Sequence, residues 1–189
     1  MSVRDGIASE HHLSPDELLA GLDHLRAAPR GEGVVELIVR RPTVDEREVV
    51  ETAELDVDDG LVGDSWQTRG RSGGRPANTK AQITVMNVRS TALVAGHRER
   101  WPLAGDQLYV DFDLSGEHIP PGTRLAVGSA VIEVTDDPHT GCKKFSGRFG
   151  LDALVFVNSP EGRALNLRGI NTRVVQAGTV RVGDAIRRL

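Results

Sequence analysis

Residues 125–150 read LAVGSAVIEVTDDPHTGCKKFSGRFG. In the first ten residues, β-branched side chains flank Gly128, and glycine supplies the positive φ that a tight turn requires. Residues 124–127 and 130–134 are therefore predicted to be the two strands of a hairpin. A proline and a glycine follow, and the segment from Cys142 to Gly150 ends as short helices do. This stretch predicts a hairpin, a loop and a helix that begins near the only cysteine of the chain.

The strand pattern extends on both sides of this stretch. Alternating apolar and β-branched residues predict further strands at residues 34–39, 47–55, 82–86, 108–112 and 173–186. A second Val-Gly turn lies in VRVGDAIRRL, residues 180–189. The chain also contains 21 glycines and 9 prolines, which fits many short strands joined by turns. We therefore expect a mostly β fold with added helices (α+β), built as a closed or nearly closed β-barrel, because closure removes exposed sheet edges.

Helices are predicted at a few places outside the strands. Ser14 and Glu17 form a capping box around Pro15, and leucines follow at helical spacing until breakers at residues 28–31. Asn87 is a helix cap for a segment that ends at Gly96. Residues 152–158 fit either a buried strand or a short helix. We expect residues 1–30 to form an N-terminal tail and helix, and residues 31–189 to form the barrel domain.

Length and composition limit the functional classes. A chain of 189 residues is about the size of one domain, and its net charge of −4 does not favour binding to nucleic acid or to an anionic membrane. Its apolar runs reach only about five residues, against the roughly 20 that span a bilayer, so a cytoplasmic protein is expected. One cysteine excludes an internal disulfide and disfavours a structural zinc site.

Cys142 is the candidate reactive group. Thr140 is predicted to cap the helix, which places Cys142 in its first turn, where the positive helix end favours a thiolate. The nearby basic residues act in the same direction: His139, Lys143, Lys144 and Arg148. The alternative is that Cys142 fills the core, since Phe145 and Phe149 lie three and seven residues later on one helix face.

Two further segments are candidate binding elements. Residues 68–80, TRGRSGGRPANTK, hold Arg69, Arg71, Arg75 and Lys80 among glycines, which suits either a phosphate-binding loop or a solvated surface loop. Residues 60–66, GLVGDSW, predict a tight turn in which Asp64 is a hydrogen-bond acceptor or an arginine partner; a plain turn closed by the Asp64 side chain is the alternative.

The order of these motifs resembles the MOSC family, named for the C-terminal domain of molybdenum cofactor sulfurases. The resemblance runs through residues 31–189 and rests on TDDPHTGCKKFSGRFG, the RGI of residues 168–170, the VGD of residues 182–184, and GLVGDSW and AGDQLYVDFDL upstream. The chain departs from the family at Asp106 and Gln107, where Glu-Asn is usual, and at Ser65 and Trp66, where basic residues are common.

The resemblance implies a MOSC-type β-barrel with an N-terminal helical extension. It also implies that Cys142 is the catalytic residue, carrying sulfur as a persulfide or binding molybdenum as its metal ligand. Binding of the molybdenum cofactor would use basic donors for its phosphate and polar partners for its pterin: Arg69, Arg71, Arg75, Lys80, His139, Lys143, Arg148, Arg168 and Arg173, with Asp64 and Asn87.

The activity implied is reduction of N-hydroxylated substrates or transfer of sulfur. A sulfur donor or an electron-transfer protein would then act in trans, because the chain has no desulfurase domain and no flavin or iron–sulfur motif. Pyridoxal phosphate, haem, flavin and zinc are not expected. The alternatives are a non-catalytic sulfur carrier or binding module, and a structural β-barrel in which Cys142 belongs to the core.

Overall fold

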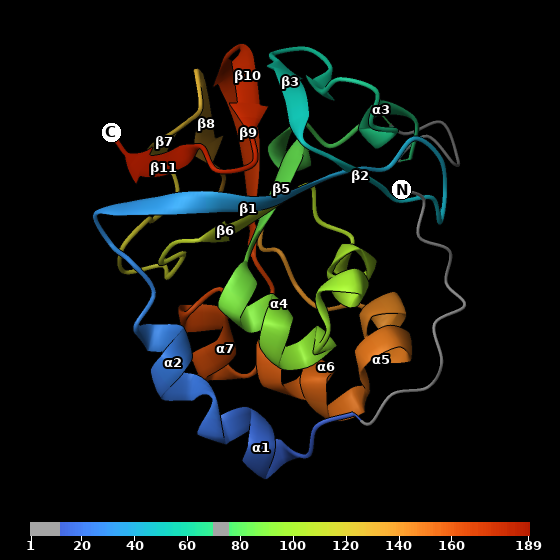
Figure 1. The fold of residues 1–189 in the computed structure, drawn as a ribbon, viewed down its shortest axis with the longest axis vertical. Helices are drawn as coiled ribbons and strands as arrows, with labels where there is room; N and C mark the ends of the chain where they lie inside the picture. Colours follow the sequence, from blue (N-terminus) through green and yellow to red (C-terminus); the bar gives the residue numbers. More distant parts are fainter. Residues whose placement is uncertain (1–11, 70–75) are drawn as a thin grey trace.

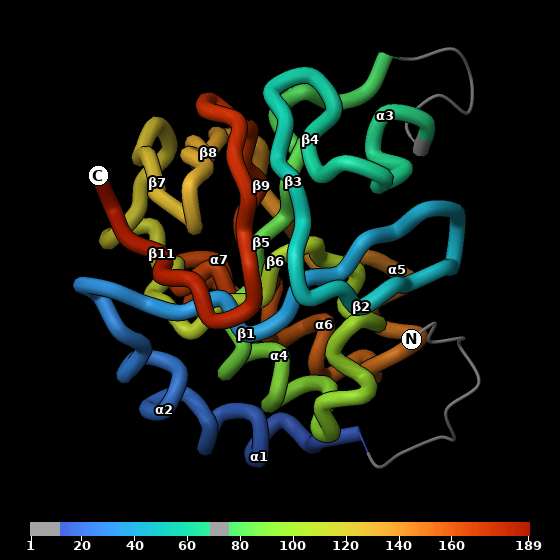
Figure 2. Tube along the Cα trace, turned by 45° about the horizontal axis from the view of Figure 1, so that its top comes forward, coloured from blue at the N-terminus to red at the C-terminus, as the bar shows by residue number. Residues whose placement is uncertain are grey.

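The main feature of the fold is a closed ring of strands. The structure, a computed structural model, describes residues 12–69 and 76–189. In ring order the strands are β1 (Glu32–Arg40), β6 (Leu108–Asp111), β5 (Ile83–Asn87), β9 (Ile170–Gln176), β8 (Ala130–Val134), β7 (Arg124–Val127) and β11 (Ala185–Arg188). Pairing of Glu32 with Arg187 joins β1 to β11 and closes the ring (Figures 1 and 2). The prediction of a β-barrel with added helices is confirmed.

Neighbouring strands in the ring are antiparallel except for β5 and β6, which are parallel. β7 and β8 form the predicted hairpin, in which Gly128 has φ of +55°. β2 (Glu48–Val50) extends the ring at β1, and β10 (Gly178–Arg181), β3 (Thr52–Asp56) and β4 (Gly60–Leu61) form a second, small sheet. The two longest predicted strands are therefore divided: residues 47–55 into β2 and β3, and residues 173–186 into β9, β10 and β11.

Helices gather on one side of the barrel, as Figure 1 shows. The elements are α1 (Pro15–Ala20), α2 (Leu22–Arg26), α4 (Val88–Ala95), α5 (Lys143–Phe149), α6 (Leu151–Asn158) and α7 (Pro160–Ala164), with η2 (Arg98–Ala104) beside them. The short α3 (Trp66–Arg69) and η1 (Thr79–Ala81) lie near the other end. Ser14 and Glu17 form the predicted capping box. No helix within residues 12–69 or 76–189 has the length and apolar character needed to cross a membrane.

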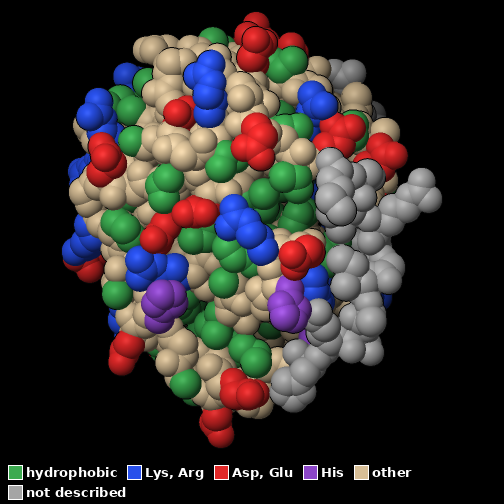
Figure 3. Space-filling model, in the orientation of Figure 1, with side chains coloured by type: hydrophobic (Ala, Val, Ile, Leu, Met, Phe, Trp, Pro, Cys, Tyr) green, Lys and Arg blue, Asp and Glu red, His purple; other side chains and the backbone are tan. Residues whose placement is uncertain are grey.

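Two hydrophobic cores hold these layers together. One fills the barrel, and the other lies between the barrel wall and the helices. On β1, Val35 and Ile38 point into the barrel whereas Leu37 and Val39 face the helices, because the pairing with β6 shifts register between Val35 and Leu37. The helix-side core also buries Leu18, Leu22 and Leu25 of the predicted N-terminal helix, which is divided into α1 and α2. Leu19, predicted to lie on the same apolar face, is exposed. On the surface, acidic and basic side chains are interspersed over the face drawn in Figure 3.

Candidate functional site

Cys142 lies on the surface at the start of α5. It occupies the N-cap position with an extended backbone (φ −120°), and its side chain makes no capping hydrogen bond. Phe145 and Phe149 are the residues of α5 that turn inward, with 2% and 1% of their surface exposed. The interpretation of Cys142 as core filling is therefore wrong. The predicted helix start is confirmed, although Cys142 itself takes the N-cap position that was assigned to Thr140.

The loop before Cys142 is fixed by the end of α6. The amide of Gly141 donates to Asn158 Oδ1 at 2.9 Å, and Asn158 Nδ2 donates back to the carbonyl of Gly141 at 3.1 Å. A Cβ at Gly141 would lie 2.7 Å from Leu154 and 3.1 Å from Val157. The absence of a side chain at residue 141 allows the loop to pack closely on α6, which holds Cys142 at a fixed place.

Three basic side chains project from α5. Lys144 lies 3.2 Å from the Asp45 carboxylate, and Arg148 lies 3.6 Å from the same oxygen. The hydrogen bond from Lys144 lowers the pKa of Asp45. Arg148 also donates to the carbonyl of Leu103 at 2.8 Å, which ties α5 to η2. The exposed Lys143, next to Cys142, has no ion-pair partner in residues 12–69 and 76–189. A local positive charge therefore exists beside the cysteine.

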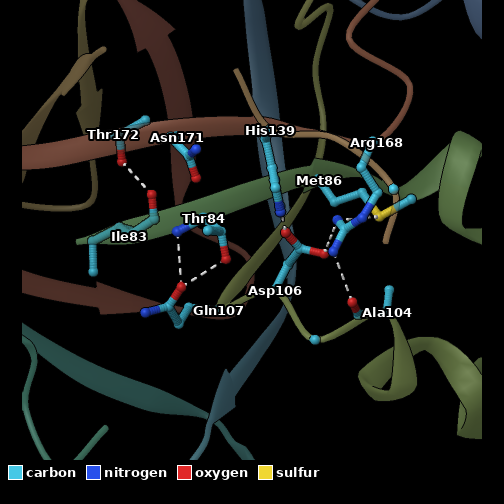
Figure 4. A network of polar contacts seen from close by, with 12 residues as sticks. Ile83, Thr84, Met86, Ala104, Asp106, Gln107, His139, Arg168, Asn171 and Thr172 are labelled. Carbon is cyan, nitrogen blue, oxygen red and sulfur yellow. Dashed lines mark hydrogen bonds and ion pairs between the residues drawn. The ribbon is translucent and has the colours of Figure 1, made fainter. Parts of the chain in front are cut away.

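Beneath α5 lies a buried pair of opposite charges, drawn in Figure 4. Asp106 is fully buried, and Arg168 Nη1 donates to its Oδ2 at 2.7 Å. Arg168 Nη2 donates to the carbonyl of Ala104 at 2.9 Å, and its guanidinium lies 5.2 Å from the centre of the Phe145 ring. Burial raises the pKa of Asp106 and the Arg168 charge opposes this effect. Because arginine keeps its proton, the short contact favours the carboxylate form of Asp106.

His139 faces the free side of the same carboxylate. Its Nδ1 lies 3.5 Å from Asp106 Oδ1, and neither atom has a hydrogen-bond partner among the described residues. Burial and the charges of Arg168 and Arg41 lower the pKa of His139. Gly169, with φ of +103°, makes this approach possible, since a Cβ there would meet the Val85 carbonyl at 2.4 Å and His139 Nδ1 at 3.3 Å.

Gln107 fixes the turn that carries Asp106. Its Oε1 accepts hydrogen bonds from the backbone N and the Oγ1 of Thr84, both at 2.7 Å, and its Nε2 donates to the carbonyl of Gln82 at 2.9 Å. Asp106 and Gln107 were absent from the predicted site residues. The signal that could have found them was AGDQ itself, the position at which this chain departs from the usual Glu-Asn of the family it resembles.

Asp64 pairs with an arginine and also accepts a hydrogen bond from Trp66 N at 2.9 Å, so both alternatives for the turn of residues 60–66 are present together. Arg41 Nε donates to Asp64 Oδ2 at 2.8 Å and Nη2 donates to Oδ1 at 3.0 Å, with both side chains buried. Arg41 Nη1 also donates to the carbonyl of Gly105 at 2.7 Å. Arg41 therefore joins this turn to the turn that carries Asp106. Arg41, which directly follows β1, was missed because the sequence around it gives no local signal for a contact with Asp64 or Gly105.

The other predicted residues lie in separate surroundings. Asn87 caps α4 through Arg89 N at 2.7 Å and donates to the Phe112 carbonyl at 2.6 Å, so its polar atoms are used within the fold. Arg173 pairs with Glu133 at 2.6 Å and Lys80 with Asp136 at 2.8 Å. Arg71, Arg75 and the side chain of Arg69 lie outside the described residues. The structure therefore brings together His139 and Arg168, with Phe145 linking them to the helix of Cys142, Lys143 and Arg148.

Two adjoining grooves run along the loop of residues 135–139. One has a volume of about 450 Å³ and includes Lys80 and Arg173 in its lining. The other has a volume of about 210 Å³ and is lined by His139 and by residues on both sides of Gly169. Both include Pro121, Val134, Thr135 and Asp136. In residues 12–69 and 76–189, no group of three His, Cys, Asp or Glu side chains is arranged to hold a metal ion.

Known proteins share this architecture. The YuaD protein from Bacillus subtilis aligns over 82% of this chain and 94% of its own, with a TM-score of 0.58 and 16% identity. YiiM from Escherichia coli gives a TM-score of 0.52 at 16% identity, covering 82% of this chain and 69% of its own. YiiM from Geobacillus stearothermophilus gives 0.51 at 14% identity, covering 83% and 73%. At these identities the likeness shows the fold.

Sequence comparison identifies the family. No curated protein sequence matches this chain. The family model of the MOSC domain matches residues 76–187, which is more than half of the chain. This range contains AGDQ, the loop before Cys142 and the RGI of residues 168–170, the segments that meet at the buried charge pair. With the barrel topology in agreement, the chain belongs to the MOSC domain family.

Proposed function

We propose that Cys142 is the functional residue of this MOSC-domain protein, and that its thiolate either coordinates the molybdenum of the molybdenum cofactor or carries a sulfur atom. The observation that carries the proposal is the position of this sulfur: exposed, at the start of α5, with its side chain in no capping hydrogen bond. Thiolate is the form of cysteine that attacks sulfur and binds metals.

The donor set fits the molybdenum cofactor in two respects. Cys142 offers the soft sulfur ligand that such a metal takes, and the ammonium of Lys143, which has no ion pair within the described part of the chain, suits the phosphate of the pterin. Further donors are proposed from Arg71 and Arg75, outside the described residues, and from Arg69, whose side chain is not described. When bound, the cofactor would supply redox chemistry for the reduction of N-hydroxylated substrates, with electrons from a separate protein.

The chain's own residues would then position the cysteine. Asn158 holds the loop at Gly141, and Arg168 supports α5 through Phe145 while it is anchored on Asp106. These contacts fix the start of α5 on the barrel wall, so the exposed sulfur is presented from a rigid support. Rigid supports are what precise ligand geometry requires.

The second candidate function is a sulfur carrier without cofactor. In that reaction the Cys142 thiolate attacks the terminal sulfur of a donor protein's persulfide. A new S–S bond forms on Cys142, the S–S bond of the donor breaks, and the donor cysteine leaves as a thiolate, so no external oxidant is needed. The exposure of Cys142 favours this candidate equally, because a donor protein must reach the sulfur.

Metal, pterin and mass analysis of the purified protein tests both candidates. The protein is produced in a host that makes the cofactor, and its molybdenum and pterin content is measured beside its intact mass with and without thiol reductant. Stoichiometric molybdenum and pterin support the first candidate; a reductant-sensitive mass increase of one sulfur without metal supports the second.

Variants show whether the signal belongs to Cys142. Cys142→Ser should abolish whichever signal the wild type gives, and Ser146→Ala, on the same helix, should retain it. Wild-type protein that holds neither cofactor nor sulfur, or a Cys142→Ser variant that holds as much as wild type, would refute the proposal.

A further inference from the structure

The smaller groove has a wall built from polar groups. Its volume of about 210 Å³ corresponds to roughly seven water molecules, enough for a ligand of a few heavy atoms. Ile119, Pro138 and Ile170 supply apolar surface, whereas Asp137, His139 and Asn171 supply polar atoms. Ile119 comes from the segment between β6 and β7. The other five residues come from the loop after β8 and from β9, which the ring of strands holds side by side. A small polar ligand would therefore meet a preformed surface.

The imidazole of His139 has one buried edge and one accessible edge. Nδ1 is buried and points toward Asp106 Oδ1, as Figure 4 shows. The side chain is 16% exposed and lines the groove. Nε2 has no hydrogen-bond partner among the described residues. It is also not one of the fully buried atoms that lack a partner, so it lies at the accessible edge. The ring therefore connects the buried carboxylate with the groove.

Asp106 determines which ring nitrogen carries the proton. Its Oδ2 is held by Arg168, and its Oδ1 faces Nδ1 with no other partner among the described residues. A lone pair on Nδ1 would face a carboxylate lone pair, so the arrangement favours a proton on Nδ1. Burial beside Arg168 and Arg41 keeps the ring neutral. A neutral ring with its proton on Nδ1 presents a lone pair at Nε2.

We propose that this groove binds a small guanidinium-type cation, which donates an N–H hydrogen bond to His139 Nε2, with Asp106 as the positioning residue. Asp137 supplies the second acceptor: its carboxylate accepts from Asn78 at 2.7 Å and has no ion-pair partner among the described residues. By contrast, Asp136 and Glu133 are already paired with Lys80 and Arg173. Lys80 acts on the Asp137 charge only at longer range, without an ion pair between the two side chains. One such carboxylate and one imidazole lone pair suit a planar cation with N–H groups on two sides. The site is independent of the chemistry at Cys142.

Nitrogen NMR of the histidine rings tests the orientation of His139. The wild-type protein at neutral pH should show His139 as the neutral form with its proton on Nδ1. Asp106→Asn should move the proton to Nε2, because an asparagine amide can donate to Nδ1. A wild-type His139 that is an imidazolium, or that carries its proton on Nε2, would overturn the proposal.

Binding is tested with methylguanidinium as the probe. It should cause saturable shifts of the amides of Asp137, His139 and Asn171 at millimolar concentration, and His139→Gln and Asp106→Asn should weaken this binding about tenfold. Methylurea has nearly the same shape without charge and should bind more weakly, and acetate should not bind. Folding of each variant is checked by its amide spectrum.

Two control variants separate this site from other effects. His97→Ala, at the exposed residue before η2, and Cys142→Ser should both bind the probe as the wild type does. The proposal is wrong if the wild type shows no saturable shift, if methylurea or acetate binds equally well, or if His139→Gln binds as tightly as wild type. Because Cys142→Ser should retain binding, failure here is distinguishable from failure of the proposed function.

Discussion

Asp106 is the residue on which the candidate site depends. Its carboxylate is fully buried, is paired with Arg168 at 2.7 Å and faces His139 at 3.5 Å. Three sequence motifs that lie far apart along the chain, AGDQ, PHTGC and RGI, meet at this one side chain. Removal of Asp106 or Arg168 would leave the other as an unpaired buried charge. This lowers the free energy of unfolding far more than the loss of a surface ion pair does.

This cost leads to a stability prediction for the pair. Arg168→Met should lower the free energy of unfolding by about 3 to 5 kcal/mol, because Asp106 loses its buried partner. Arg173→Ala is the matched control: the Arg173 side chain is 55% exposed and its partner Glu133 keeps a second pair with Arg124, so a loss of about 1 kcal/mol or less is expected. Urea denaturation followed by circular dichroism measures both. Equal losses in the two variants would show that the buried pair contributes no more than the exposed pair.

A pH dependence follows from His139. Its pKa is lowered in the folded protein, so below about pH 6.5 the unfolded chain binds a proton that the folded chain does not. The stabilisation is therefore fully present above pH 6.5 and is lost as pH falls, by up to about 1.4 kcal/mol per pH unit. His139→Gln should lack this contribution. Denaturation curves between about pH 7.5 and about pH 5.5 compare the two proteins, and identical slopes would contradict the prediction.

At the residue scale, the sequence predicted single residues better than their partners. Local signals placed Cys142 at a helix start and offered an arginine partner or a plain turn for Asp64, both of which the structure contains. The exposure of Cys142 was left open, because two phenylalanines on one helix do not say which face carries residue 142. Arg41 and Asp106 were missed since their partners lie 23 and 62 residues away, beyond the reach of any local pattern.

At the scale of elements, glycines decide how closely loops approach the barrel. Gly169 lets the RGI segment pass against β5, with its φ of +103° and the Val85 carbonyl 2.4 Å from the position of a Cβ. Gly147 lies within α5, and a Cβ there would meet nothing within 4 Å. The same substitution therefore has opposite physical consequences at the two positions.

Alanine at these two glycines gives a paired prediction. Gly169→Ala should destabilise the protein by about 2 kcal/mol or more, through backbone strain and the contact with Val85. Gly147→Ala should stabilise it by up to about 1 kcal/mol, because alanine favours the helix. Thermal unfolding of both variants measures the difference. Stabilisation at residue 169, or a large loss at residue 147, would contradict it.

Element boundaries were predicted well where the signals were local. Capping residues predicted the starts of α1 and α4, and Gly128 predicted the hairpin of β7 and β8. Residues 152–158 were undecided because five apolar residues suit both structures. They form α6 because Ala153, Phe156 and Val157, at helical spacing, pack into the core on the helix side of the barrel.

At the scale of the whole molecule, the ring depends on its last strand. β11 pairs with β1 on one side and with β7 on the other. The sequence predicted a barrel from many short strands, but it could not predict that residue 187 pairs with residue 32, because strand order is set by long-range packing. Closure is therefore a property of the complete ring rather than of any segment.

Removal of β11 tests this dependence. A chain that ends after Gly183 exposes one edge of β1 and one edge of β7, and such edges pair with other chains. We expect loss of cooperative unfolding and formation of oligomers in size-exclusion chromatography. Arg187→Ala keeps the strand, so this variant should unfold cooperatively and elute at the same size as the wild type. A truncated chain that unfolds cooperatively as a species of unchanged size would show that the ring does not need β11.

The pairing of β1 with β11 also has a consequence during synthesis. Residues 32–34 leave the ribosome early, whereas residues 185–187 leave it last among the paired segments. Until residues 185–187 have emerged, β1 therefore keeps one unpaired edge and the nascent barrel cannot close. Such exposure is where chaperones act on β-rich chains, so the time between the emergence of β1 and that of β11 determines how long the incomplete ring is at risk of aggregation.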